Sequence, residues 1–133
     1  MRIMLDTNVL ISMILFPGKK FNQMLEYITR DHTLVISSFV VDELFAVTER
    51  KFPAKRDAVD RFLSGLGYEL AYTPHKMKAD LFSIRDDKDY PVLYTAISEN
   101  VDILITGDKD FKDIDIEKPE ILTPAEFVSL YIR

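Results

Sequence analysis

Short segments with strand character recur along the chain, and segments with helical patterns separate them. The predicted strands are Arg2–Leu5, Thr33–Ser37, Tyr68–Tyr72 and Asp102–Thr106, with Glu120–Leu122 as a candidate fifth. Continuous apolar runs such as Ile-Met-Leu and Ile-Leu-Ile are typical of strands that are buried on both faces of a parallel sheet. Because parallel neighbours need a crossover connection, the alternation predicts a three-layer α/β/α fold around a central parallel sheet of four to five strands.

The intervening segments show the spacing of amphipathic helices. Residues 21, 24, 25 and 28 are apolar and repeat at helical intervals. Pro91 begins another such segment, in a first-turn position where its missing N–H does no harm. The predicted helices are Asn8–Ile14, Phe21–Arg30, Ser38–Arg50, Lys55–Leu66, Lys76–Ile84, Pro91–Glu99 and Pro124–Ile132.

Length and composition fit one globular domain over residues 1–133. A chain of 133 residues with 47% hydrophobic and 29% charged residues can bury a core. The absence of cysteine excludes a disulfide framework and a cysteine zinc site. No apolar run approaches the roughly 20 residues that a membrane span requires, so we expect a cytoplasmic protein with no membrane contact.

Four acidic residues lie where a predicted apolar strand ends or on the inward face of a predicted helix. Asp6 and Asp108 follow predicted strands, Glu43 shares a helix face with apolar residues, and Asp89 precedes the helix that begins at Pro91. In parallel sheets the ligand site lies beyond the carboxyl ends of the strands. Four carboxylates gathered there would repel one another unless a cation joined them. Oxygen-only ligands select Mg²⁺ or Mn²⁺, which indicates metal-dependent phosphodiester chemistry.

Each acid also has a simpler interpretation. Asp6 and Asp89 are favoured types for helix N-caps, and Asp108 lies in a Thr-Gly-Asp-Lys-Asp run that is typical of a turn. Glu43 has Arg50 two turns along its helix as a possible salt-bridge partner. The sequence therefore leaves open whether these carboxylates serve structure or a metal.

The segments IMLDTNVLIS, DEL, DKDYPVLYTAI and ILITGDKDF together resemble the PIN domain over almost the whole chain, and most closely the VapC-like toxins of toxin–antitoxin pairs. The resemblance implies a Mg²⁺- or Mn²⁺-dependent ribonuclease with a PIN-like sheet, a homodimer held inactive by a protein antitoxin. It assigns Asp6, Glu43, Asp89 and Asp108 as catalytic and metal-binding. Because Mg²⁺ requires closely placed oxygen ligands, we expect Asp6 and Asp89 to be the most direct ligands. One departure is Tyr90, which stands where this branch more often has asparagine.

The resemblance also suggests supporting positions. Asn8 and Thr106 match accompanying polar residues, and Asp110 falls where some members carry a further acid. Lys88, Lys109 and Lys112 flank the acids and are candidates for RNA phosphate contacts. Their simpler role is that of solvated loop lysines.

Other functions remain open. A PIN nuclease outside toxin–antitoxin pairs would use the same acids, and a catalytically idle PIN module would bind without cleaving. A phospho-aspartate phosphatase usually needs a second acid two residues after its nucleophile, whereas Asn8 stands there after Asp6. A receiver domain needs an acceptor Asp after its middle strand, but Thr33–Ser37 runs into Ser38 and Phe39.

Overall fold

The strands form a single parallel sheet in the computed structural model, which describes residues 1–111 and 113–132. Within these residues the sheet has five strands in the order β3-β2-β1-β4-β5, and every neighbouring pair is parallel. The strands are β1 (Arg2–Leu5), β2 (Thr33–Ser37), β3 (Glu69–Ala71), β4 (Ile103–Ile105) and β5 (Glu120–Leu122). The predicted α/β fold with a parallel sheet is confirmed.

The register of the sheet places apolar residues side by side at its centre. Ile3 of β1 pairs with Leu34 of β2 on one side and with Ile103 of β4 on the other. All three side chains are buried. Because β1 has a strand on each side and a helical layer over each face, its apolar sequence has no solvent-exposed side.

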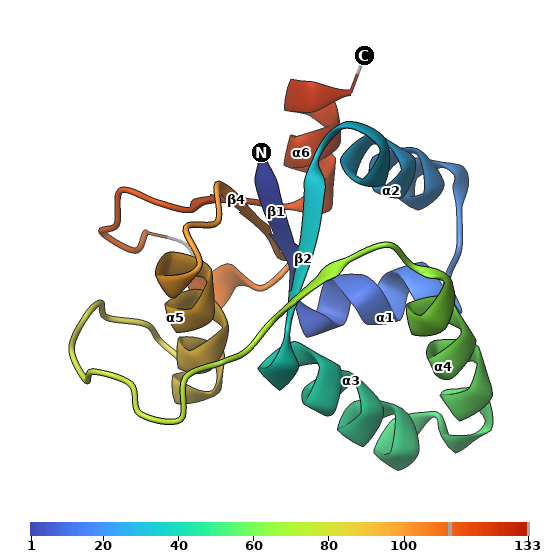
Figure 1. Cartoon of the computed structure of the whole chain (residues 1–133), viewed down its shortest axis with the longest axis horizontal. Coiled ribbons are helices and arrows are strands. Elements are labelled where there is room, and N and C mark those ends of the chain that lie inside the picture. Colours follow the sequence, from blue (N-terminus) through green and yellow to red (C-terminus); the bar gives the residue numbers. More distant parts are fainter. Residues whose placement is uncertain (112, 133) are drawn as a thin grey trace.

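Helices occupy both sides of the sheet (Figure 1), with α5 on the side opposite α1 and α4. None of the described helices is long and apolar enough to cross a membrane. The α-helices are α1 (Thr7–Leu15), α2 (Lys19–Asp31), α3 (Ser38–Lys51), α4 (Arg56–Gly65), α5 (Tyr90–Ser98) and α6 (Pro124–Tyr131).

Three single-turn 3₁₀ helices were not predicted. They are η1 (Pro53–Lys55), η2 (Asp87–Asp89) and η3 (Lys109–Phe111). The predicted strands Arg2–Leu5, Thr33–Ser37 and Glu120–Leu122 match their observed bounds, and the other strands and six of the helices differ by one or two residues at their ends.

The predicted helix Lys76–Ile84 is wrong, because residues 76–84 form an irregular loop. Asp80 has a φ of 66°, in the left-handed region that a helix interior does not accept. The loop instead uses α5 for support. The hydroxyl of Tyr94 accepts a hydrogen bond from the Lys78 N–H at 3.2 Å, and the hydroxyl of Tyr90 donates to the Lys78 carbonyl.

The strand order reverses direction next to β1. The chain runs outward from β1 to β2 and β3, and then returns through α5 to place β4 and β5 on the other side of β1. At such a switch point the connections after β1 and β4 diverge and leave a crevice at the carboxyl ends of the strands. Asp6 and Thr106 are the first residues after those two strands.

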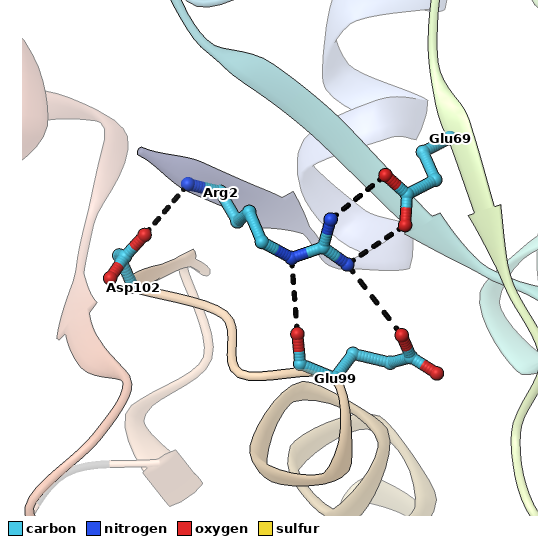
Figure 2. Close-up of polar contacts among 4 residues, drawn as sticks. All are labelled: Arg2, Glu69, Glu99 and Asp102. Atoms are coloured by element: carbon cyan, nitrogen blue, oxygen red, sulfur yellow. Dashed lines mark hydrogen bonds and ion pairs between the residues drawn. The ribbon is translucent and has the colours of Figure 1, made fainter.

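The amino-terminal edge of the sheet is closed by charges that pair with one another (Figure 2). The Arg2 guanidinium donates to both carboxylate oxygens of Glu69, at 2.8 and 2.9 Å, and to the Glu99 carbonyl at 3.0 Å. The Arg2 N–H donates to Asp102, whose other oxygen accepts from Lys118 at 3.0 Å. The Arg2 bond lowers the pKa of Glu69, and the bonds from Arg2 and Lys118 lower that of Asp102. Arg2 thus ties β1 to β3 and to the end of α5.

We predict that Arg2→Gln lowers the free energy of unfolding by about 1 kcal/mol at pH 7, because it removes a bidentate pair that is only partly exposed. A lowered carboxyl pKa contributes stability above the unfolded-state pKa, and this contribution is lost as pH falls through the folded-state value. The difference between wild type and variant should therefore shrink as Glu69 is protonated. Urea denaturation at several pH values measures this difference in the free energy of unfolding.

Arg30→Gln is the control, since Arg30 pairs only at the exposed surface of α2. This substitution should lower the free energy of unfolding by no more than a few tenths of a kcal/mol. An equal loss in both variants would contradict the structural role of Arg2.

Candidate metal centre

Asp6 is held in a fixed orientation at the end of β1. It is the N-cap of α1, where its Oδ1 accepts the Val9 N–H at 3.0 Å. Its Oδ2 accepts a hydrogen bond from the Thr106 hydroxyl, and its own N–H donates to the Ile105 carbonyl of β4. The side chain is only 5% exposed. The cap interpretation of Asp6 is therefore confirmed, and the same cap fixes the carboxylate at the switch point.

Thr106 connects Asp6 to the turn that follows β4. Its hydroxyl donates to Asp6 and accepts the Asp108 N–H at 3.0 Å. Asp108 Oδ1 accepts the Asp110 N–H at 2.9 Å, so this part of the Thr-Gly-Asp-Lys-Asp run is also a hydrogen-bonded turn. The turn interpretation of Asp108 is correct for one of its oxygens, and the residue is only partly buried.

Glu43 reaches the same region from α3. Its Oε1 accepts a hydrogen bond from the hydroxyl of Thr7, the first residue of α1. Within the described residues, Glu43 forms no ion pair with Arg50, so the salt-bridge interpretation is wrong. Thr7 was not singled out by the sequence analysis, because a threonine beside a stronger cap residue carries no distinct signal.

Asp89 occupies the N-cap position of α5 but makes no side-chain cap hydrogen bond. Tyr90 is the first helical residue of α5. The Asp89 Oδ2 atom is buried and, within the described residues, is the only buried side-chain oxygen or nitrogen without a hydrogen-bond partner. A buried carboxylate oxygen with no donor is unfavourable, so a cap does not explain its position.

Asp86 joins this group and was missed by the sequence analysis. Carboxylate oxygens of Asp86, Asp89 and Asp110 all lie within 4.8 Å of one another. Asp86 precedes Asp89 by three residues, and residues three apart lie on the same side of a 3₁₀ turn. That spacing was visible in Asp-Asp-Lys-Asp, but a tight turn had to be recognised before it carried meaning. The only cation paired with the group is Arg85, at 3.8 Å from Asp110 within the described part of the chain.

The pKa values show that the acids act on one another. Burial raises the pKa of Asp6 to about 6, and the charges of Asp108 and Glu43 add to the rise, while hydrogen bonds from Thr106 and Val9 oppose it. Burial also raises the pKa of Asp89 to about 7, with further contributions from the charge of Asp108 and from a hydrogen bond to it. That bond exists only when a proton lies between the two carboxyls, so the ionised Asp89 oxygen has no partner. Asp108 influences both pKa values and therefore links the two groups.

This donor set fits a divalent cation. All of its side-chain ligands are oxygens, it lacks cysteine and histidine, and it leaves one buried carboxylate oxygen unsatisfied. Oxygen ligands suit Mg²⁺ and Mn²⁺ better than zinc. A cation would reverse the cost of placing these carboxylates together, because it replaces their repulsion by attraction.

The other expected site residues lie around the acids. Asn8 is exposed in the first turn of α1, and Lys88 and Lys109 are exposed in η2 and η3. Lys112 lies outside the described residues. Exposure of Lys88 and Lys109 is compatible both with phosphate contacts and with simple solvation, so their role stays a prediction.

Tyr90 supports the loop of residues 76–84 through its ring and its hydroxyl. Its ring stacks on Phe82 with centroids 4.4 Å apart, and its hydroxyl contacts Lys78 and accepts from the Leu81 N–H at 3.3 Å. Tyr90 thus supports the loop of residues 76–84, while the acid beside it faces the site. The departure from asparagine therefore has a structural role outside the carboxylate cluster.

The family model described as the PIN domain matches residues 2–110. The search of curated proteins finds no match.

Several solved structures match nearly the full length of the chain. VapBC2 from Rickettsia felis, crystallised bound to a DNA fragment from their promoter, matches with a TM-score of 0.75 and 25% identity over 92% of this chain and 98% of that one. VapBC-1 from nontypeable Haemophilus influenzae matches with a TM-score of 0.68 and 19% identity, over 94% of this chain and 99% of that one. VapC20 of Mycobacterium tuberculosis, a toxin that cleaves the sarcin–ricin loop, matches with a TM-score of 0.60 and 10% identity. The match covers 82% of this chain and 92% of that one. The last two likenesses show the fold alone.

The raised pKa of Asp89 predicts how the metal-free protein responds to pH. A carboxyl whose pKa is raised on folding binds its proton more tightly in the native state, so it lowers stability as pH rises from about 4 to about 7. Asp89→Asn removes this dependence. We expect the variant to be as stable as wild type near pH 4 and more stable at pH 8 when both are measured in EDTA by thermal melting. If Asp89→Asn instead unfolds the protein at every pH, Asp89 is a structural residue.

Proposed function

Since this chain belongs to the PIN domain family, we propose that it is a divalent-metal-dependent endoribonuclease that hydrolyses RNA phosphodiester bonds. The observation that carries the proposal is the buried, unpartnered Oδ2 of Asp89 within a linked set of carboxylates. A purely structural set of acids would place its buried oxygens against donors. The position at the switch point supports it further, because open parallel sheets bind ligands there.

We assign Asp6, Glu43, Asp89 and Asp108 as catalytic and metal-binding residues. Asp6 and Asp89 are the most direct ligands, because Asp6 and one oxygen of Asp89 are buried, and burial together with the charges of neighbouring acids raises the pKa of both. Asp110 and Asp86 complete the carboxylate surface beside Asp89. A bound Mg²⁺ or Mn²⁺ would neutralise charge on the scissile phosphate and activate the attacking water.

The supporting residues of the site keep the acids in place. The Thr106 hydroxyl, oriented by the Asp108 N–H, holds one oxygen of Asp6, and the Val9 N–H holds the other. Thr7 similarly holds Glu43. The bonds from Thr106 and Val9 favour the ionised form of Asp6, and the bond from Thr7 fixes the orientation of Glu43. The acids are therefore oriented before substrate and metal arrive, which lowers the cost of ordering them in the reaction.

Cations near the acids are candidates for contacts with RNA phosphates. Lys88 and Lys109 are exposed on the turns that carry Asp89 and Asp108, and Arg85 is 77% exposed beside Asp110. A net charge of −5 leaves little attraction for a polyanion over the whole surface. Binding should therefore depend on a few local contacts and on the bound metal.

We further propose that the protein is the toxin of a toxin–antitoxin pair, inhibited by a protein antitoxin and assembled as a homodimer in the cytoplasm. The support is the match, at 25% identity and a TM-score of 0.75, to the VapBC2 complex over 92% of this chain. Copurification of the chain with the product of a neighbouring reading frame, followed by light scattering of the complex, tests both the partner and the dimer.

The metal proposal predicts a thermal shift. Mn²⁺ at ten times its dissociation constant should stabilise the wild type by about 1.4 kcal/mol, which raises Tm by several degrees in a domain of this size. Asp6→Asn should keep the fold, because asparagine is also a good N-cap, but should lose most of this shift and the Mn²⁺-dependent cleavage of RNA.

Asp60→Asn on the exposed surface of α4 is the matched control and should keep both the shift and the cleavage. Equal cleavage in EDTA, or a wild-type Tm that does not respond to millimolar Mn²⁺, would contradict a metal-dependent site.

The charge distribution predicts a preference for single-stranded RNA. Recognition of a duplex relies on many phosphate contacts along a rigid helix, whereas a flexible strand can bring one phosphate to a recessed acidic site. We expect cleavage of a labelled hairpin in Mn²⁺ to fall in its loop. Total tRNA and rRNA should be tested as well, because a specific toxin can ignore an arbitrary hairpin. Cuts confined to the stem would contradict this prediction.

A further inference from the structure

A pocket lies directly beside the acid cluster, between the loop of residues 76–84 and the turn η2. Its volume is about 550 Å³, within the range of small-molecule sites. The four proposed catalytic acids do not line this pocket, although the turn η2, which carries Asp89, borders it through Asp87. Residues that matter for its chemistry are Ala79, Asp80, Phe82, Ser83, Asp87 and Tyr90.

The turn η2 separates the pocket from the metal side. Asp86 and Asp89 are three residues apart and lie on one side of this 3₁₀ turn, where their carboxylates approach Asp110. Asp87 is displaced by about a third of a turn and lines the pocket instead. One rigid turn thus presents two carboxylates to the metal side and a third to the pocket.

The pocket combines an apolar wall with hydrogen-bond acceptors. Phe82 and Tyr90 stack on each other and form the wall, and the Tyr90 hydroxyl is already occupied by the loop backbone. The carboxylates of Asp80 and Asp87 can only accept hydrogen bonds when ionised, and Ser83 can do either. Such a pocket suits a planar group with several donors on one edge.

We propose that this pocket binds a guanine base of the RNA substrate, in the nucleotide next to the cleaved phosphate. The inference rests on the proposed ribonuclease function and names the specificity of that site. Guanine is the one RNA base with two adjacent donors, N1–H and the N2 amine, on its Watson–Crick edge. These two donors match the two oxygens of one carboxylate, and Asp87 is the residue placed to receive them.

Position on the chain favours a base over a protein segment as the occupant. Tyr90 and Asp87 flank Asp89 in sequence, so a phosphate that reaches the Asp89 carboxylate has its neighbouring nucleoside at the mouth of the pocket. Arg85 and Lys88, both exposed next to the same turn, supply the positive charge that the adjoining phosphates need. Specific RNA recognition generally takes unstacked bases in this manner.

The test compares two short single-stranded RNAs that differ in one atom group. One carries a single guanosine in an oligouridine strand, and the other carries inosine, which lacks the N2 amine. Ca²⁺ replaces Mn²⁺ so that binding is measured without cleavage, by fluorescence anisotropy. Wild type should bind the guanosine strand roughly tenfold more tightly, the size expected for one bidentate contact. In Mn²⁺, cuts should fall at a fixed distance from the guanosine.

Two variants test the pocket itself. Asp87→Asn should reduce the guanosine-to-inosine ratio toward one, and Ala79→Trp should do the same by filling the pocket. Both should keep the Mn²⁺ thermal shift, which shows that the fold and the metal side are intact, and Asp60→Asn should keep the ratio. Equal binding of both strands by wild type, or an unchanged ratio in both pocket variants, would overturn the inference while leaving ribonuclease activity in place. If the wild type prefers the guanosine strand in binding but shows no Mn²⁺-dependent cleavage of any RNA, the proposed function is overturned instead.

Discussion

Burial of the Asp6 carboxylate between two strands is the constraint on which the site depends. Parallel pairing of β1 with β4 brings the residue after each strand to the same edge, so that Thr106 lies over Asp6 and donates to it. The Val9 N–H uses the other oxygen of Asp6. Two hydrogen bonds fix the orientation of this carboxylate, and the charges of Asp108 and Glu43 add to the rise in its pKa that burial causes.

The acidic residues at the two ends of the sheet have pKa values shifted in opposite directions. At the amino end, Arg2 and Lys118 pair with Glu69 and Asp102, and both acids have lowered pKa values. At the carboxyl end, Asp6 and Asp89 have raised pKa values and Asp89 keeps an unsatisfied oxygen. The paired acids thus lie at one edge of the sheet, and the acids that repel one another lie at the other. Such separation is common where a binding site needs an unfavourable local arrangement.

Sequence patterns predicted the strands well because each strand is decided locally, by apolar residues and by the polar residue that follows. They failed over residues 76–84, where helical spacing was present but the backbone follows tertiary contacts to Tyr90 and Tyr94 and a left-handed Asp80. Three of the four acids were selected from their positions at strand or helix ends, and Glu43 from its place on the apolar face of a helix. Asp86 was not, because its alignment with Asp89 exists only in the 3₁₀ turn. Asp6 is an N-cap, and the hydrogen bonds of the cap are compatible with its proposed role as a metal ligand.

The loop of residues 76–84 is fastened to α5 mainly through its own peptide groups. The Lys78 N–H and carbonyl and the Leu81 N–H all meet tyrosine hydroxyls, and these contacts make no demand on the loop side chains. Phe82 and Ile84 are exceptions, since the Phe82 ring stacks on Tyr90 and Ile84 packs against the core. Most positions in the loop can therefore change by mutation while the backbone keeps its course. A scaffold of this kind permits evolutionary drift in what the surface recognises without disturbing the carboxylates a few residues away.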